Sequence, residues 1–124
     1  MYEIEVTDHF SAAHRLRDQG SECEKIHGHN WFVTVVVRCS DLDAIGLGID
    51  FKVLRTHLAH VIAGLDHMLL NDVPPFDGIN PSTENLARFV FERMRERLGS
   101  SPARMHRVRI SEGPNTAATY VGEP

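Results

Sequence analysis

Alternating apolar and polar positions predict strands at both ends of the chain. Residues 2–13 alternate around Ile4 and Val6, and residues 27–39 contain a run of β-branched and aromatic side chains at 31–37. We expect these two stretches to pair as a long hairpin. Residues 107–111 and 116–121 predict two further strands, joined by a turn at 113–115.

Two amphipathic helices are predicted between the strand pairs. Asp50 is placed to cap the first helix, whose apolar positions recur every three or four residues: Phe51, Leu54, Leu58, Val61, Ile62 and Leu65. Ser82 is placed to cap the second, and Gly99 to end it. The buried stripe of the second helix is expected to be Leu86, Phe89, Val90, Met94 and Leu98. Residues 71–81 contain three prolines and predict a loop.

The order strand, strand, helix, helix, strand, strand indicates an α+β domain. We expect a four-stranded antiparallel sheet with both helices on one face, and a single domain over residues 1–124. A sheet of this size has two open edges, and oligomerisation is a natural way to cover them.

Composition and charge exclude several classes of protein. The formal net charge of −4 argues against a nucleic-acid-coating role, which needs a basic surface. No apolar stretch approaches the roughly 18 residues that span a bilayer, and residues 1–8 do not resemble a signal peptide. The two cysteines, Cys23 and Cys39, provide no disulfide framework. We therefore expect a cytoplasmic protein with no membrane and no nucleic-acid partner, and Cys39 as a core residue.

Histidine is unusually frequent, with 8 in 124 residues. His27 and His29 stand two apart at the start of the second predicted strand, so their side chains share one face. The hairpin brings His14, at the end of the first strand, beside them. Three neutral imidazoles with a vacant fourth position are typical of a catalytic zinc site. The alternative is that this His-x-His pair is surface decoration.

Other polar residues near these histidines suggest acid–base chemistry. Cys23 precedes His27 by four residues, and a dication and Lys25 nearby would lower the pKa of its thiol. Cys23 is then a candidate base or nucleophile; alternatively it is an inert loop residue, or a fourth ligand that makes the zinc site structural. In Asp66-His67 the aspartate can orient the imidazole, although the dipeptide alone is a weak signal and a polar helix terminus is the alternative interpretation. Glu112, at a strand end, can accept two hydrogen bonds from a heterocycle edge or be a solvated turn residue.

Short motifs in a fixed order along almost the whole chain carry a family resemblance. They are Phe10-Ser11-Ala12-Ala13-His14-Arg15-Leu16, Cys23 followed by His27-Gly28-His29-Asn30, Ile49-Asp50-Phe51, Leu65-Asp66-His67, Leu70-Asn71-Asp72, Asn80-Pro81, Glu84-Asn85-Leu86-Ala87 and Glu112. In this order and spacing the chain resembles the 6-pyruvoyl-tetrahydropterin synthase and 6-carboxy-tetrahydropterin synthase family.

The resemblance implies the tunnelling fold, in which protomers join their sheets into a barrel as homo-oligomers, usually trimers stacked into hexamers. It implies zinc held by His14, His27 and His29, and 7,8-dihydroneopterin triphosphate as substrate. Cys23 would be one acid–base group, and Asp66 with His67 the second, lent by a neighbouring subunit. Glu112 would anchor the pterin ring. Arg15 and Lys25 are the candidates for holding the triphosphate.

The expected product is less closely defined. Three residues between Cys23 and His27 resemble the 6-carboxy-tetrahydropterin synthases of the queuosine pathway. Glu24, however, is similar to the glutamate of a paralogue group that releases 6-hydroxymethyl-dihydropterin for folate synthesis, and a carboxylate has a lower ordinary pKa than a thiol. A dual activity, a solvated role for Glu24, and a zinc- or pterin-binding oligomer without chemistry stay open as alternatives.

Overall fold

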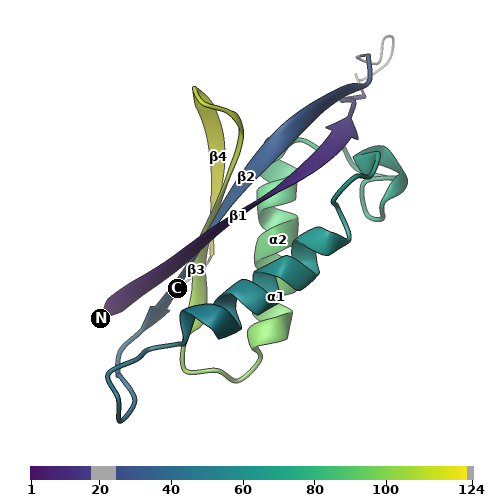
Figure 1. Ribbon diagram of the computed structural model, residues 1–124. Coiled ribbons are helices and arrows are strands. Elements are labelled where there is room, and N and C mark those ends of the chain that lie inside the picture. The colour runs from purple at the N-terminus through teal and green to yellow at the C-terminus, as the bar shows by residue number, and fades with distance from the viewer. Residues whose placement is uncertain (18–24, 123–124) are drawn as a thin grey trace.

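The computed structural model describes residues 1–17 and 25–122, and its element order is the predicted one (Figure 1). Two strands, β1 (Tyr2–His14) and β2 (His27–Cys39), precede two helices, α1 (Phe51–Ala63) and α2 (Thr83–Leu98). A single 3-10 turn, η1 (Leu70–Asp72), lies between the helices. Strands β3 (Arg104–Gly113) and β4 (Thr116–Val121) complete the domain.

The four strands form one antiparallel sheet in the order β1-β2-β3-β4. β1 and β2 pair over their full length, from Tyr2 opposite Cys39 to His14 opposite His27. This register matters for function because it sets His14 directly beside His27. The outer strands β1 and β4 form the two edges of the sheet.

Both helices cover one face of the sheet, as predicted (Figure 1). In β2 the side chains that face the helices alternate along the strand, and Trp31, Val33, Val35 and Val37 are fully buried. α1 and α2 contribute Leu54, Leu58, Leu86, Val90 and Met94 to the same core. Cys39 is buried there too, in agreement with its expected packing role.

The helix caps are also those predicted from the sequence. The Asp50 carboxylate accepts a hydrogen bond from the Lys52 N–H at 2.8 Å, and the Ser82 hydroxyl accepts one from the Asn85 N–H. Gly99 ends α2 with a positive φ of 54°.

Several details differ from the sequence-based expectation. α1 ends at Ala63, before Leu65, and Phe89 of α2 is only half-buried. Phe51 is 60% exposed, because it occupies the first turn of α1, where no preceding turn covers it. β3 begins at Arg104, three residues early, since its N-terminal part is polar and lacks the apolar alternation used to predict it. The predicted loop 71–81 contains part of η1, a turn too short to show a periodic pattern.

The chain after α1 runs beside the free edge of β1. The His67 N–H donates to the Ser11 carbonyl at 2.6 Å, and the Ala13 N–H donates to the Met68 carbonyl at 3.0 Å. Ala13 and Leu69 also form a parallel bridge. This pairing fixes residues 66–71 against the end of β1 that carries His14.

Candidate metal centre and adjoining cavity

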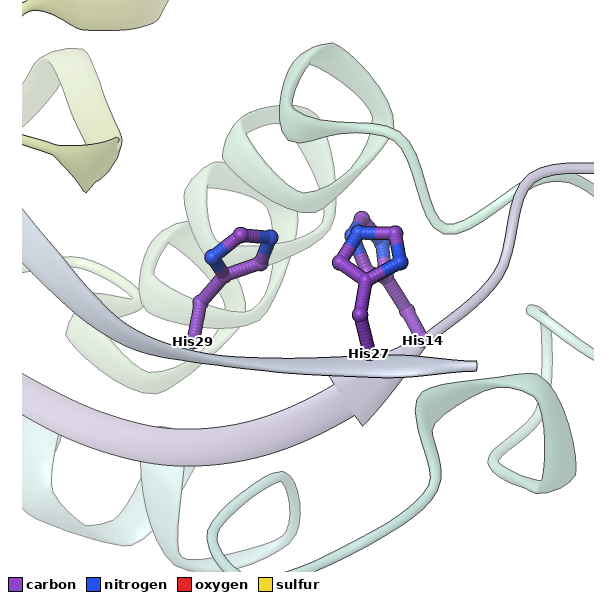
Figure 2. A group of neighbouring side chains, drawn as sticks. All are labelled: His14, His27 and His29. Carbon is purple, nitrogen blue, oxygen red and sulfur yellow. The ribbon is translucent and has the colours of Figure 1, made fainter. Parts of the chain in front are cut away.

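Three histidines meet at the end of the β1–β2 hairpin (Figure 2). One ring nitrogen from each of His14, His27 and His29 lies within 4.8 Å of the other two. The ring centroids are 4.6 Å apart for His14 and His27, 4.8 Å for His27 and His29, and 5.4 Å for His14 and His29. The strand register and the two-residue repeat of β2 bring the rings together from distant parts of the sequence.

Backbone carbonyls set the tautomers of two of these rings. His14 Nδ1 lies 2.8 Å from the Pro81 carbonyl oxygen, and His27 Nδ1 lies 2.9 Å from the Lys25 carbonyl oxygen. A carbonyl oxygen only accepts, so each Nδ1 carries the proton and each Nε2 keeps a lone pair. A second hydrogen bond of this kind is the usual way to orient a metal-binding imidazole.

The donor set fits a metal ion. The Nε2 atoms of His14 and His29 are buried and make no hydrogen bond, which is costly for a polar atom unless something else binds it. His29 Nε2 has the Glu112 carboxylate 3.3 Å away, outside hydrogen-bond geometry, whereas His14 Nε2 has no polar partner among the described residues. Neutral imidazole nitrogens are good ligands for zinc, and three of them leave a coordination position open. The cluster of three histidines is therefore suited to hold zinc.

The floor of the cluster is apolar. Trp31 is fully buried, and its ring lies 4.8 Å from that of His14 and 5.3 Å from that of His29, edge to face in both cases. Burial lowers the pKa of His14 below its ordinary value of 6.5, although the Pro81 carbonyl opposes this shift. His14 is thus held neutral, the form that binds a metal.

Glu112, the predicted anchor, lies beside the cluster. Its Oε2 is 3.3 Å from His29 Nε2, and its Oε1 accepts a hydrogen bond from the Thr83 hydroxyl at the start of α2. A cavity of about 190 Å³ opens here, lined by Thr83, Glu84, Glu112, Thr116, Ala117 and Ala118. The carboxylate therefore stands between the histidine cluster and a cavity at the β4 edge.

Asp66 and His67 form a second polar pair, on the segment that runs beside β1. His67 Nδ1 is 2.9 Å from Asp66 Oδ2, and Asp66 Oδ1 accepts a hydrogen bond from the Ser11 N–H at 2.9 Å. The Ser11 N–H, together with His67, lowers the pKa of the Asp66 carboxyl. Within residues 1–17 and 25–122, neither side chain bonds to the three histidines, and His67 is 81% exposed.

Of the four remaining predicted site residues, the structure describes two and leaves two outside the described ranges. Cys23 and Glu24 lie outside the described residues. Arg15 directly follows His14 and is half-buried, while Lys25 is exposed two residues before His27. Both cationic residues are therefore close in sequence to a histidine of the cluster.

Sequence reasoning assigned no role to several groups that the structure brings to the site. The Thr83 hydroxyl holds Glu112, the Pro81 carbonyl holds His14, and the side chains of Asn71 and Asn80 hold the main chain just after β1. Asn71, Asn80 and Pro81 were recognisable only as parts of short motifs. Their contacts cross more than 50 residues of chain, so no local pattern reveals them.

Fold and site together define a class of small α+β proteins that hold three histidines at the end of a β-hairpin, next to a carboxylate-lined cavity. The family model for 6-pyruvoyl tetrahydropterin synthase matches residues 3–123. The chain therefore belongs to the 6-pyruvoyl tetrahydropterin synthase family.

Individual relatives cover nearly the same length. A 6-carboxy-5,6,7,8-tetrahydropterin synthase of Synechocystis sp. is 31% identical over 116 residues, which is 90% of this chain and 86% of that protein. A dihydroneopterin monophosphate aldolase of Pyrococcus furiosus is 34% identical over 104 residues, which is 84% and 83% of the two chains. The solved structure of Caenorhabditis elegans 6-pyruvoyl tetrahydropterin synthase superposes with a TM-score of 0.84 at 28% identity, covering 98% of this chain and 96% of the other.

Proposed function

We propose that this protein is a zinc-dependent lyase that converts 7,8-dihydroneopterin triphosphate to 6-carboxy-5,6,7,8-tetrahydropterin. The observation that carries the proposal is the cluster of His14, His27 and His29, with two buried Nε2 atoms that have no hydrogen bond. Family membership and a relative named as a 6-carboxy-tetrahydropterin synthase support the choice of substrate and product.

His14, His27 and His29 would hold the zinc through ring nitrogens. When bound, zinc supplies Lewis-acid chemistry that acidifies the hydroxyl groups of a substrate side chain. The Pro81 and Lys25 carbonyls keep two of the rings in the tautomer that leaves Nε2 free. The apolar contact with Trp31 keeps water away from the inner side of the cluster.

Glu112 would bind the amino-pyrimidinone edge of the pterin. That edge presents two parallel N–H donors, which match the two oxygens of a carboxylate. The Thr83 hydroxyl donates to Oε1 and so restricts the rotation of the carboxylate. The ring would enter the cavity between α2 and β4, and its side chain would extend toward the histidines.

Proton transfer would be shared between Cys23 and the Asp66–His67 pair. Cys23, as a thiolate, would move the proton at the side-chain carbons. Asp66 holds the His67 ring through Nδ1, which leaves Nε2 to exchange a proton with substrate. Loss of triphosphate, followed by hydrolytic cleavage that releases the two outer side-chain carbons as acetaldehyde, would leave the carboxyl group on the pterin. Arg15 and Lys25 would neutralise the departing triphosphate.

The proposed site needs a second copy of the chain. Asp66 and His67 make no bond to the three histidines in the described part of their own protomer, and β4 and the part of β1 before Ser11 form open edges of the sheet. We propose a homo-oligomer, a trimer or hexamer, in which one subunit supplies Asp66 and His67 to the histidine cluster of another.

Product analysis tests the reaction directly. Zinc-loaded protein is incubated with 7,8-dihydroneopterin triphosphate, and the pterin formed is identified by chromatography and mass spectrometry. Formation of 6-carboxy-tetrahydropterin is expected, and absence of any turnover would overturn the proposal.

Glu112→Gln should raise KM more than it lowers kcat, because it removes the anchoring charge. Glu96→Gln, an exposed change on α2, is the matched control.

A second candidate reaction is supported by the Pyrococcus relative, whose name describes an aldolase acting on a dihydroneopterin phosphate. Aldol-type cleavage here would release 6-hydroxymethyl-7,8-dihydropterin, with Glu24 as the base. Cys23→Ala and Glu24→Ala, assayed separately, distinguish the two reactions. Each product should disappear with the loss of its own base, and a dual activity would show both products in the unmodified protein.

A binding protein without chemistry gives a third pattern. It would bind zinc and pterin and form no product even at high protein concentration. The same incubation, followed by equilibrium dialysis of the pterin, separates that outcome from failure of the preparation to bind substrate at all.

A further inference from the structure

Two asparagine side chains continue the edge of the sheet beyond β1. The Arg15 N–H donates to Asn71 Oδ1 and Asn71 Nδ2 donates to the Arg15 carbonyl, both at 2.9 Å. The Arg17 N–H donates to Asn80 Oδ1 at 2.7 Å, and Asn80 Nδ2 donates to the Arg17 carbonyl at 3.0 Å. Each carboxamide therefore satisfies both main-chain groups of one residue, as a neighbouring strand would.

These bonds belong to one continuous ladder. Ser11 and Ala13 bond to the chain at 66–68, and Arg15 and Arg17 bond to the two asparagines. Alternate residues of an extended chain direct their N–H and C=O groups to the same side, so residues 11, 13, 15 and 17 all face this segment. His14 lies in the middle of the stretch that the ladder immobilises.

The asparagines are themselves held in place. Asn71 is only 8% exposed and belongs to η1. The Asn80 carbonyl accepts a hydrogen bond from Asn85 Nδ2 at 2.8 Å, which ties it to the first turn of α2. The Arg17 guanidinium donates to the Phe76 carbonyl, so the segment contacts the same loop a further time.

The two asparagines support His14 in two ways, one through the main chain and one through the ring. Asn71 fixes the main chain of Arg15, the next residue after His14. Asn80 fixes the position of Pro81, whose carbonyl oxygen accepts from His14 Nδ1 at 2.8 Å. Main chain and ring are thus both held by the segment 71–81, and the Nε2 atom is left aimed into the cluster without a hydrogen bond.

We propose that Asn71 and Asn80 are positioning residues that set the orientation of His14 for metal binding. This inference rests on the proposed metal centre, and it assigns to the two carboxamides a task beyond stabilising the loop. Partners that orient a metal-binding histidine typically change metal affinity 10–100-fold when they are removed. If the two asparagines only stabilised the loop, their removal would leave the zinc affinity of the folded protein unchanged.

The test measures zinc affinity of the full-length protein by competition with a chromophoric chelator. Asn71→Ala and Asn80→Ala are expected to weaken zinc binding about 10–100-fold. With Co²⁺ as the probe, both variants should lose part of the intensity of the visible absorption bands that report tetrahedral geometry. Val90→Ala, in the core of α2, controls for loss of stability, and Asn115→Ala, on an exposed turn, controls for loss of an amide.

A double-mutant cycle shows whether the effect passes through His14. In a His14→Ala background, Asn80→Ala should cause no further loss of affinity, because the ring that it orients is gone. Equal loss in both backgrounds, or wild-type affinity in Asn71→Ala and Asn80→Ala, overturns the inference. If an alanine variant does not fold by circular dichroism, Asn80→Ser repeats the test, since its short hydroxyl cannot bridge both Arg17 groups.

The outcome also separates this inference from the proposed function. If the wild-type protein binds no zinc, both are overturned. If it binds zinc with equal strength in all the asparagine variants, only the positioning role is overturned and the metal centre stands.

Discussion

His67 adopts a backbone conformation that few side chains tolerate. Its φ is +60°, in the left-handed region, where histidine, asparagine and aspartate are enriched and β-branched residues are outliers. The His67 N–H donates to the Ser11 carbonyl, and its ring contacts Asp66, so the turn both presents the ring and closes the edge of β1. This conformation results from pairing with β1 and has no sequence signal of its own.

We expect His67→Val to destabilise the protein by about 1–2 kcal/mol, because the branched side chain opposes a positive φ. His67→Asn is the control, since it also removes the contact with Asp66 but tolerates the conformation. Urea unfolding of both variants measures the difference. Equal stability of the two would show that the backbone at this position is not strained.

His14 should make the stability of the metal-free protein depend on pH. Burial lowers its pKa in the folded state below 6.5, so between these two values the unfolded chain binds more protons than the folded one. The contribution of His14 to stability is therefore complete above pH 6.5, and it is lost as the pH falls through the folded-state pKa.

Urea unfolding in the presence of EDTA, from pH 8 to pH 5, checks this dependence. His14→Gln should show a flatter profile than the wild-type protein, because the titrating group is removed. All other residues are the same in both proteins, so the difference between the two profiles isolates His14. Parallel profiles would contradict the prediction.

The elements pack closely where the loop before α1 crosses the end of the sheet. A Cβ added to Gly48 would stand 2.3 Å from Cys39 Sγ and 2.7 Å from Ile4 Cδ1. Cys39 is buried, so it has little room to move. The absence of a side chain at position 48 therefore lets the loop lie against β1 and β2 and start α1 in the correct place.

Gly48→Ala should cost about 1–3 kcal/mol of unfolding free energy, the usual penalty for overpacking. Gly78→Ala is the matched control, because the nearest atom to its added Cβ is the Pro75 carbonyl oxygen at 3.7 Å. Thermal unfolding followed by circular dichroism compares them. A Gly48→Ala protein as stable as Gly78→Ala would mean that the loop shifts freely.

Across the whole molecule, the histidine cluster lies at one end of the apolar core. The core lies between the helices and the sheet, and Trp31 belongs to it while also contacting the rings of His14 and His29. The cluster stands at one end of the hairpin, above Trp31. A metal at this position therefore adds to a fold that already has its own apolar core.

Removal of zinc by a chelator should abolish activity and leave the far-ultraviolet circular dichroism spectrum largely unchanged. Loss of the fold on chelation would instead indicate a closed structural site with Cys23 as a fourth ligand, since structural zinc sites contribute folding free energy directly. Readdition of zinc is expected to restore activity, which controls for irreversible damage.

The family and the order of elements could be predicted from the sequence because they depend on local signals. Apolar periodicity, two helix caps and the His-x-His spacing are each contained within about 15 residues. The grouping of His14 with His27 followed from expecting one hairpin, and the structure pairs these two residues directly. No membrane-length apolar helix occurs among the described residues.

The tertiary structure decided how the site is supported. The supporting groups reach their partners across 29 to 67 positions of chain, and their contacts depend on how the helices dock on the sheet; these groups belong to Asn71, Asn80, Pro81 and Thr83. Neither Asp66 nor His67 bonds to the three histidines within the described part of the protomer. Periodicity describes which face of an element is apolar, whereas the meeting of polar groups from different elements depends on packing geometry, which no single segment contains.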